Sequence, residues 1–517
     1  MPPTNEDPLA DKLSGCSGTV ARRRRARARG LVLVAGLGVV GCAVGPNYRK
    51  PDPGAADAWS RLEATGAPVA NAGARGDLSE WWRRLDDALL SELVDEAQRQ
   101  SLDLRKARAR LREARARRGV AGATRFPTVN ASASASRSES SAGGVAGVGG
   151  AAGAASGSTA AVAGTQLSAG FDASWELDVF GGVRRSVEAA DADQESAAAS
   201  LDDARVSLVA EVARNYVEVR SLQTRLSIAR TNLASQAETL QLTEFRAQAG
   251  LVSTQDVEQA RSNREQTVAQ IPTLETSLAE AEHALDVLLG QTPGSLHARL
   301  SVAGSLPQVP SRVSVGIPAD TLRQRPDVRA AERKFAAETA RVGVAEAARY
   351  PSFKLSGSVG LDALLGGATG NTTGSSSSLL GNITAPIFDA GRLKSQAEAQ
   401  DAVREQAEVA YEQAVLTALQ DVENALVALA RSRERGEALT RAAEAARSAA
   451  QLARQRYGAG VIDFQSVIDT DRTVLSVEDS LASTRTDEVL ALIRLYKALG
   501  GGWSQQTDPR TASRGAP

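Results

Sequence analysis

The chain has 517 residues, of which 42% are hydrophobic but only 4% aromatic, and its formal net charge at pH 7 is −1. This composition can supply sizeable cores and long helices, whereas the near-zero charge argues against bulk attraction to nucleic acid. The two cysteines, Cys16 and Cys42, cannot make a disulfide framework, and no Cys/His spacing typical of a metal site occurs in the sequence.

The N-terminal segment has the pattern of a secretion signal. An arginine-rich stretch at 22–29 precedes the apolar run LVLVAGLGVVG at 31–41, which is too short to span a bilayer but fits a signal-peptide core. Small residues then lead to Cys42, as in the lipobox of bacterial lipoproteins. We expect residues 1–41 to be removed as a signal peptide, with 1–20 interpreted as an over-long start. The alternative is a basic arm followed by a buried helix.

The residues after the cysteine also carry information. Cys42 is expected to become the acylated first residue of the mature chain, an N-palmitoyl and S-diacylglycerol cysteine. The next residue is Ala43, and the absence of Asp there favours the outer membrane, because Asp at this position is a common inner-membrane retention signal. GPNYRKP shows no periodic pattern and is interpreted as an extended strap.

Two halves of the chain carry the same landmarks in the same order. FPTVNASASAS at 126–136 is echoed by YPSFKLSGSVG at 350–360. FRAQAGLVSTQDV ends at Val257 and aligns with QRYGAGVIDFQSV, which ends at Val467, at an offset of 210. We therefore predict an internal duplication, and its two structural repeats are expected over 77–294 and 319–502.

Each half contains two segments of alternating hydrophobicity. The clearest one places apolar side chains such as Leu167, Phe171 and Trp175 on one face and polar side chains on the other, which favours a strand over a helix. Strands are predicted at about 127–136, 165–180, 352–361 and 379–389. Glycine- and serine-rich loops are expected between the members of each pair, at 137–164 and 362–378.

The predicted strands have the length of tilted transmembrane strands, although strands of a soluble sandwich would show the same alternation. Four strands cannot close a membrane barrel, and open edges are not tolerated in lipid. If these strands lie in a membrane, several chains must therefore share one barrel.

Long helices are predicted between the strand pairs. Residues 183–245 and 392–457 are almost free of glycine and proline, and about sixty helical residues span roughly 90 Å. Each is expected to be followed by a return helix, with turns at Gly250 and Gly460. The shorter helices predicted by the pattern are 254–289, 464–498 and 319–348. A soluble coiled-coil protein is the alternative, but it leaves the alternating strands and the lipobox unexplained.

Several stretches resemble a known family. They are CAVGPNYRKP from Cys42, the pair Trp81-Trp82, AEVARNYVEVRSLQTRLSIARTNL at 210–233, LRQRPDVRAAERKFAAETARVGVAEAARYPS at 322–352, and the closing LGGGW. Together they cover nearly the whole mature chain. The chain resembles the TolC-like outer-membrane factor family, in its NodT-type lipoprotein branch.

The resemblance implies a mixed α and β membrane protein. A homotrimer is expected, in which four strands per chain make a twelve-stranded outer-membrane β-barrel that a long periplasmic α-helical barrel continues. Residues 42–76 are then an acylated strap and equatorial segment, 295–318 an equatorial linker, and 503–517 a disordered tail.

The resemblance also implies a function. The protein is expected to be the passive exit duct of a tripartite efflux pump, working with a periplasmic membrane-fusion adaptor and an inner-membrane RND-type transporter. Its other expected contact is outer-membrane lipid. The alternative is the outer-membrane duct of an ATP-driven type I protein secretion system.

The resemblance places a gate at the periplasmic turns. Asp469 corresponds to a constricting aspartate, Tyr457 to a tyrosine that locks the hairpin in some members, and Asp256 to the carboxylate partner of that tyrosine. The sequence departs from the family at two positions, because a second gate aspartate falls on Ser466 and a locking arginine on Ile462.

The inventory of reactive side chains argues against an enzyme. His283 and His297 are the only histidines, and the sequence has no phosphate-binding loop, zinc-binding spacing or nucleophile elbow. We therefore expect no catalytic residues, no metal and no cofactor. The stretch RQRPDVRAAER mixes basic and acidic residues and is not interpreted as a nucleic-acid site.

Overall fold

The computed structural model describes residues 43–52, 54, 59, 69–70, 78–140, 162–310, 313–314, 318–367 and 370–503. Cys42, the predicted signal peptide, most of residues 53–76 of the predicted segment 42–76, and residues 504–517 lie outside the described residues. The chain divides into two compact units. The strand unit comprises the described residues of Met1–Asn47, Val120–Glu188 and Ala340–Asp401. The helix unit comprises those of Tyr48–Gly119, Ala189–Thr339 and Ala402–Pro517.

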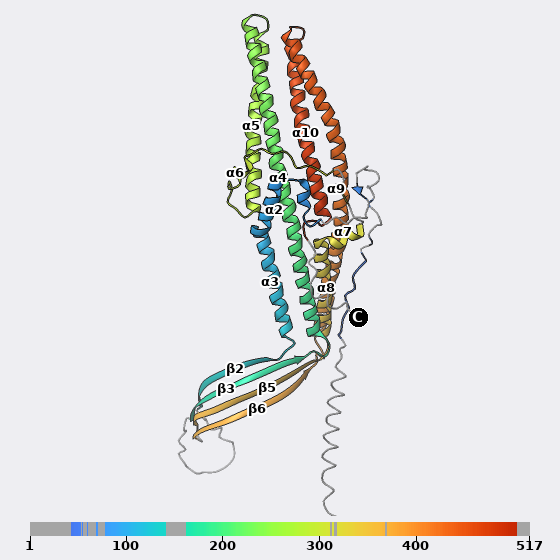
Figure 1. Ribbon diagram of the computed structural model, residues 1–517. Helices are drawn as coiled ribbons and strands as arrows, with labels where there is room; N and C mark the ends of the chain where they lie inside the picture. The colour runs from blue at the N-terminus through green and yellow to red at the C-terminus, as the bar shows by residue number, and fades with distance from the viewer. Residues whose placement is uncertain are drawn as a thin grey trace, which may run out of the picture. The chain divides into compact units, whose positions relative to one another are not determined.

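The strand unit contains one antiparallel sheet of four strands in the order β2-β3-β5-β6 (Figure 1). The strands are β2 Thr128–Ser140, β3 Val162–Leu177, β5 Ser352–Gly367 and β6 Gly370–Thr384. Because side chains alternate along a strand, the register that pairs Phe171 with Ala131 and Val359 collects apolar residues on one face. β2 and β6 are the two edge strands of this sheet.

The second predicted strand pair differs from the structure. The strand predicted at 379–389 is β6, which begins at Gly370 and ends at Thr384, and most of the loop predicted at 362–378 is strand. Serine, threonine and glycine occupy both faces of residues 370–378, so the period-two signal is too weak to see. Pairing with β5 orders the segment instead, and Ser358 and Ser378 join their hydroxyls at 2.8 Å across the pair.

Long antiparallel helices make up most of the helix unit. α4 Gly182–Gln248 and α9 Arg392–Gly458 each have 67 residues, and the first turns of both belong to the strand unit. α5 Thr254–Leu288 and α10 Phe464–Ala498 each have 35 residues. The equal lengths agree with an internal duplication. The other elements are β1 Val69–Ala70, η1 Trp81–Leu85, α2 Ala88–Gln100, α3 Leu102–Ala123, α6 His297–Leu300, β4 Val313–Ser314, α7 Pro318–Gln324 and α8 Pro326–Ala347.

The helix predicted at 319–348 is two helices, α7 and α8, which are separated at Arg325. Pro326 disfavours helical geometry in the residue before it, which explains the break. Arg325 is buried at the break, where it donates to the carboxylates of Asp327 and Asp421 and to the carbonyl of Ala498. These bonds attach the junction of α7 and α8 to the neighbouring helices α9 and α10.

The main core of the helix unit surrounds two tryptophans. Trp81 and Trp82 are buried among side chains of α2, α4, α5 and α10, and the ring of Trp81 stacks on that of Tyr496 at 5.2 Å. Two short strands, β1 and β4, pair in parallel and so join residues 69–70 to residues 313–314. Within the described residues, the hydropathy of each helix is too low, or its length too short, for it to cross a bilayer.

Candidate functional site

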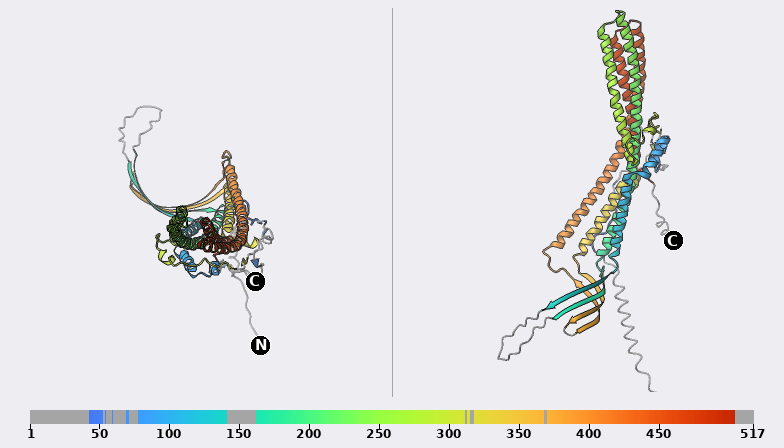
Figure 2. Two further views of the ribbon diagram at one scale, coloured as in Figure 1. Left: turned by 90° about the horizontal axis from the view of Figure 1, so that it is seen from above. Right: turned by 90° about the vertical axis from the view of Figure 1, so that its left-hand side faces the viewer.

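The two helical hairpins end in matching turns at the same end of the helix unit (Figures 1 and 2). Gly250 and Gly460 have φ of 71° and 75°, and no neighbouring atom lies where a Cβ would be added. Glycine is therefore favoured at both positions by the left-handed backbone conformation, and not by a lack of space for a side chain. The residue after each glycine donates its backbone N–H to a carbonyl five positions earlier, which closes a Schellman-type end on α4 and α9.

Tyr457 is 3% exposed at the end of α9 and contacts the ring of Phe464 at a centroid distance of 5.3 Å. Its cluster also contains apolar side chains of α5 and α10, including Ala260 and Val467. The Tyr457 hydroxyl has no hydrogen-bond partner among the described residues. The ring of Tyr457 thus packs one hairpin against the other, while its hydroxyl is buried without a partner among the described residues.

Arg246, near the end of α4, holds the last turn of α9. Its Nη1 donates to the carbonyl of Tyr457 at 2.6 Å, and its Nη2 donates to that of Gly458 at 2.9 Å. The guanidinium carbon also lies 4.5 Å from the centroid of the Tyr457 ring. The last carbonyls of a helix lack partners within the helix and carry partial negative charge, so a cation is well suited to them.

Sequence reasoning missed Arg246, although the repeat carried a signal. The offset of 210 between the two halves places Arg246 opposite Arg456, so each long helix has an arginine in its last turn. Arg456 is exposed, and among the described residues no hydrogen bond or ion pair joins it to the other hairpin. The repeat alone could not show which of the two arginines crosses to the other hairpin.

The predicted pair of Tyr457 and Asp256 is not brought together in this single chain. Asp256 instead accepts from the backbone N–H of Ser253 at 3.0 Å and from its hydroxyl at 2.9 Å, which completes a capping box at the start of α5. The locking role of Asp256 stays a prediction.

Asp469 is exposed on α10 and accepts a hydrogen bond from Gln465 at 2.9 Å. Two turns earlier, Asp463 caps the same helix and accepts from the backbone N–H of Ser466 at 3.0 Å. Hydrogen bonds from the Ser466 side chain and backbone hold the pKa of Asp463 below its usual value, so this carboxylate stays charged at the tip. Carboxylates therefore flank the Gly460 turn on its α10 side.

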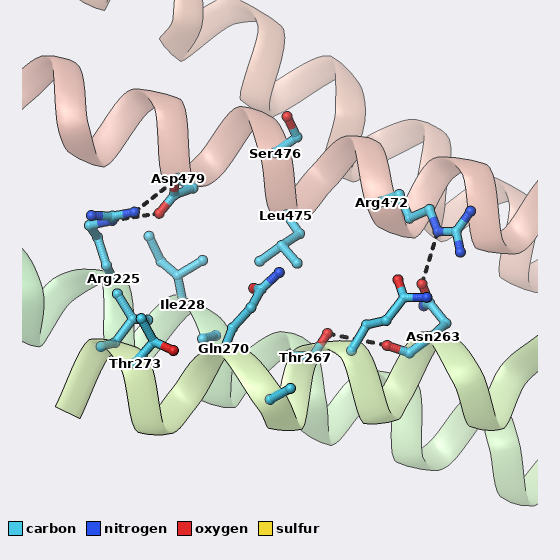
Figure 3. Close-up of a pocket in the computed structure, with 14 residues that line it drawn as sticks. Arg225, Ile228, Asn263, Thr267, Gln270, Thr273, Arg472, Leu475, Ser476 and Asp479 are labelled. Carbon is cyan, nitrogen blue, oxygen red and sulfur yellow. Dashed lines mark hydrogen bonds and ion pairs between the residues drawn. The ribbon is translucent and has the colours of Figure 1, made fainter. Parts of the chain in front are cut away.

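Further along the hairpins, polar bonds join α10 to α4 and α5 (Figure 3). Arg225 donates to both oxygens of Asp479, at 2.7 and 3.1 Å, and Arg472 donates to the buried amide of Asn263 at 3.1 Å. Between these two bonds lies a pocket of about 600 Å³, into which Leu475 points from α10 (Figure 3). The contact between the hairpins is thus polar and incompletely filled.

A buried ion pair lies beside this contact. Asp471 is 3% exposed on α10 and accepts from Arg454 of α9 at 2.8 Å. Burial raises the pKa of Asp471, and the charge and hydrogen bond of Arg454 oppose that rise. This pair lies within the second hairpin, so it stabilises that hairpin rather than its contact with the first.

The sheet of the strand unit has two different faces. One face exposes large apolar side chains, including Phe171 at 62% and Val359 at 61%. On the other face, Ser132 donates to Asp172 at 3.3 Å and Ser376 donates to Asp362 at 3.1 Å. An exposed apolar face on a sheet with an opposite polar face is the arrangement of a transmembrane strand set, in which lipid covers one side and water the other.

The described residues hold no group of three or more His, Cys, Asp or Glu side chains placed to bind a metal ion. What they offer instead is a sheet with one lipid-compatible face and two paired helical hairpins, which defines a membrane-channel subunit. The family model described as outer membrane efflux protein matches residues 93–291 and 317–501. The chain belongs to this family, and its resemblance to the TolC-like outer-membrane factors is confirmed.

Similar proteins extend over almost the whole chain. Nodulation protein T of Rhizobium leguminosarum bv. trifolii is 32% identical over 90% of this chain and 95% of its own length. The toluene efflux pump outer membrane protein TtgF of Pseudomonas putida is 30% identical over 93% of this chain and 98% of its own length. The solved structure of the outer-membrane channel OprN has a TM-score of 0.79 and 36% identity, and the match covers 89% of this chain and 100% of that one.

Proposed function

We propose that three copies of this chain form the outer-membrane exit duct of a tripartite efflux pump. The observation that carries the proposal is the sheet: β2 and β6 are open edges, and one face exposes large apolar side chains. Unpaired strand edges are not stable in lipid, and three sheets of four strands supply twelve strands, an even number within the range of known barrels. The duct is passive and opens at its periplasmic end.

The substrates are drugs or other small molecules, delivered by a periplasmic adaptor and an inner-membrane RND-type transporter. Two observations support this choice over a duct for polypeptides. The N-terminal sequence has the lipoprotein pattern of the NodT-type branch, and a relative over nearly the full length is named for toluene efflux. A deletion strain should become sensitive to drugs or solvents and regain resistance with this gene. Loss of a secreted polypeptide, with resistance unchanged, would favour type I secretion instead.

The periplasmic gate consists of the two hairpin tips, with turns at Gly250 and Gly460 and side chains of Tyr457, Asp256 and Asp469. In the closed trimer, three copies of Asp469 approach one another and narrow the duct. This assignment is supported by the exposure of Asp469 near the tip and by the contacts of the Tyr457 ring between the hairpins.

The N-terminus is attached to lipid through Cys42. Support comes from the adjacent strap within the strand unit, where the backbone N–H of Val44 donates to the carbonyl of Phe180 at 3.1 Å. Arg185 donates to the side chain of Asn47 at 2.6 Å and to the carbonyl of Gly45 at 3.4 Å. The strap therefore docks at Phe180, three residues after β3 ends at Leu177, and Cys42 directly precedes the strap in the sequence.

The gate is tested by Asp469→Ala in planar bilayers. Removing a ring of three carboxylates should raise single-channel conductance and should sensitise cells to a large antibiotic that is normally excluded, because the charges no longer constrict the duct. Asp487→Ala is the matched control, since Asp487 is also exposed on α10 but lies five helical turns further from the tip. Equal conductance in the two variants would remove Asp469 from the gate.

A further inference from the structure

The helix α3 carries an excess of positive charge that its own chain does not neutralise. Its 22 residues include eight basic and two acidic side chains, a formal charge of +6. Arg118 pairs with Asp191 of α4 at 2.6 Å, and Arg117 pairs with Glu113 within α3. Five exposed cations have no partner recorded among the described residues: Arg105, Lys106, Arg110, Arg112 and Arg115.

This charge is unfavourable in an isolated helix. Like charges three or four positions apart repel each other, and α3 has such pairs at Arg108/Arg112 and Arg112/Arg115. Only Leu104 and Leu111 of α3 are buried. The helix therefore has little hydrophobic contact to offset the repulsion, and an external anionic surface would relieve it.

The opposite charge lies on α9. From residue 398 to residue 423, this helix has seven acidic side chains and one arginine, a formal charge of −6. Some of these carboxylates are paired within the chain, as Asp421 is with Arg325. Glu405 and Glu412 are exposed and have no recorded partner among the described residues. Val409 lies between these two glutamates in the sequence and is 55% exposed, and Leu416 follows Glu412 by one helical turn and is 67% exposed.

In the helix unit, α3 and α9 are the outer members of a row of four helices (Figure 1). α3 joins α4 through Arg118 and Asp191, and α4 joins α8 through Lys334, which lies 3.2 Å from Asp193. α8 joins α9 in a cluster that contains Val328. The order α3-α4-α8-α9 follows the strand order β2-β3-β5-β6.

Chain connectivity extends this order to a second copy. α3 leads into the edge strand β2 through residues 124–127, and the other edge strand, β6, leads into α9 through residues 385–391. If β2 of one copy pairs with β6 of the next, these short connections bring α3 of the first copy beside α9 of the second. The two helices then run antiparallel, because one enters its strand and the other leaves.

The charged residues also match in height along the two helices. Arg112 and Arg105 lie 11 and 18 residues before the end of α3, or about 17 and 27 Å from it. Glu405 and Glu412 lie 13 and 20 residues after the start of α9, or about 20 and 30 Å. Both pairs have a seven-residue spacing, so each pair lies on one helix face, and the small Ala109 lies between the two arginines.

We propose that the basic face of α3 and the acidic face of α9 form an electrostatic seam between neighbouring copies of this chain. Arg112 faces Glu405 and Arg105 faces Glu412, and the exposed Val409 and Leu416 pack between the charges. The seam rests on the proposed function, because it needs several copies around one barrel. The seam repeats at every boundary between subunits, so a substitution that weakens it acts at three interfaces in a trimer.

The test is a charge reversal with a rescue. We expect Arg105→Glu/Arg112→Glu to weaken the trimer, with the concentration at half-dissociation in mild detergent rising at least about tenfold by analytical ultracentrifugation. Glu405→Arg/Glu412→Arg should do the same. The chain that carries all four changes restores opposite charges and should return to within roughly threefold of the parent. Circular dichroism checks that each variant keeps its helical content.

Arg435→Glu/Arg441→Glu is the matched control, because it makes the same charge change at exposed positions of α9 outside the proposed seam. It should leave the trimer unchanged. Raising NaCl from about 0.05 to 1 M should weaken the parent trimer and affect the singly reversed chains less, because salt screens exposed ion pairs.

Four results separate the alternatives. Charge-reversed chains that remain trimeric would overturn the seam. So would a chain with all four substitutions whose trimer is no more stable than that of either double variant. Reversed α3 chains that stay trimeric but lose binding to vesicles with anionic headgroups would also overturn it, and would assign α3 to the lipid surface instead. A parent chain that is monomeric in membranes would overturn the proposed trimeric duct itself.

Discussion

At the tip of the hairpins, one arginine makes three contacts with a single turn of another helix. Arg246 donates to the carbonyls of Tyr457 and Gly458 and covers the face of the Tyr457 ring. In the proposed gate, moving one hairpin away from the other has to break all three contacts. We therefore expect Arg246 to act as a latch that uses backbone acceptors instead of a paired carboxylate.

Arg246→Ala should shift the gate toward the open form by at least about tenfold, because hydrogen bonds from a charged donor contribute roughly 1.5 kcal/mol or more. Open probability in planar bilayers is the measurement. Arg456→Ala is the control, since it removes the repeat-related arginine, which makes no hydrogen bond or ion pair to the other hairpin within the described part of the chain. Equal open probability in the two variants would show that Arg246 is not a latch.

The sequence pattern predicted the turn glycines, and the family resemblance implied Asp469, Tyr457 and Asp256, but neither predicted the contacts that Arg246 makes. The turn glycines follow from local backbone geometry, which a sequence pattern records. The partner of Tyr457 depends on how α4 and α9 pack against each other. The contacting residues are more than two hundred positions apart in the chain, so no local sequence pattern indicates this contact. In the proposed trimer, the residues that face Asp469 belong to other copies of the chain, so a single sequence does not indicate them.

Among the elements, the strands differ most in how clearly the sequence indicated them. β3 carries large apolar residues on one face, so its alternation is unambiguous. β6 has serine and threonine on both faces, and only its pairing with β5 defines where it begins. The break between α7 and α8 was also missed, although Pro326 signals it, because the helical periodicity continues on both sides of Arg325.

The two faces of the sheet predict unequal effects of the same substitution. Phe171→Arg places a charge on the apolar face near the middle of β3, which costs roughly 2–4 kcal/mol in lipid. Ser168→Arg places it on the polar face a short distance away and should be tolerated. The amount of heat-resistant protein recovered from the outer membrane measures the difference. A sheet that does not meet lipid would accept both changes equally.

For the whole molecule, the proposed lipid anchor and the proposed barrel differ in how firmly they hold the protein in the membrane. Several acyl chains on one cysteine give stable anchoring, but they are less permanent than segments that span the bilayer. The anchor is therefore expected to help the chain find the membrane and assemble, rather than to keep the finished duct there.

Cys42→Ser should accordingly reduce the amount of assembled trimer in outer-membrane fractions severalfold and leave the conductance of each assembled channel unchanged. Quantitative immunoblotting and single-channel recording measure the two quantities. A normal trimer level with altered conductance would contradict this division of roles.

The equal lengths of the two repeats restrict how insertions and deletions can accumulate in this chain. Removing one residue from α4 would turn Arg246 by about 100° around the helix axis and withdraw it by about 1.5 Å, away from the carbonyls of α9. Inserting seven residues would keep its direction but move it about 10 Å past them. Only a change of the same size in the other hairpin restores the contact, so α4 and α9 are expected to change length together during evolution.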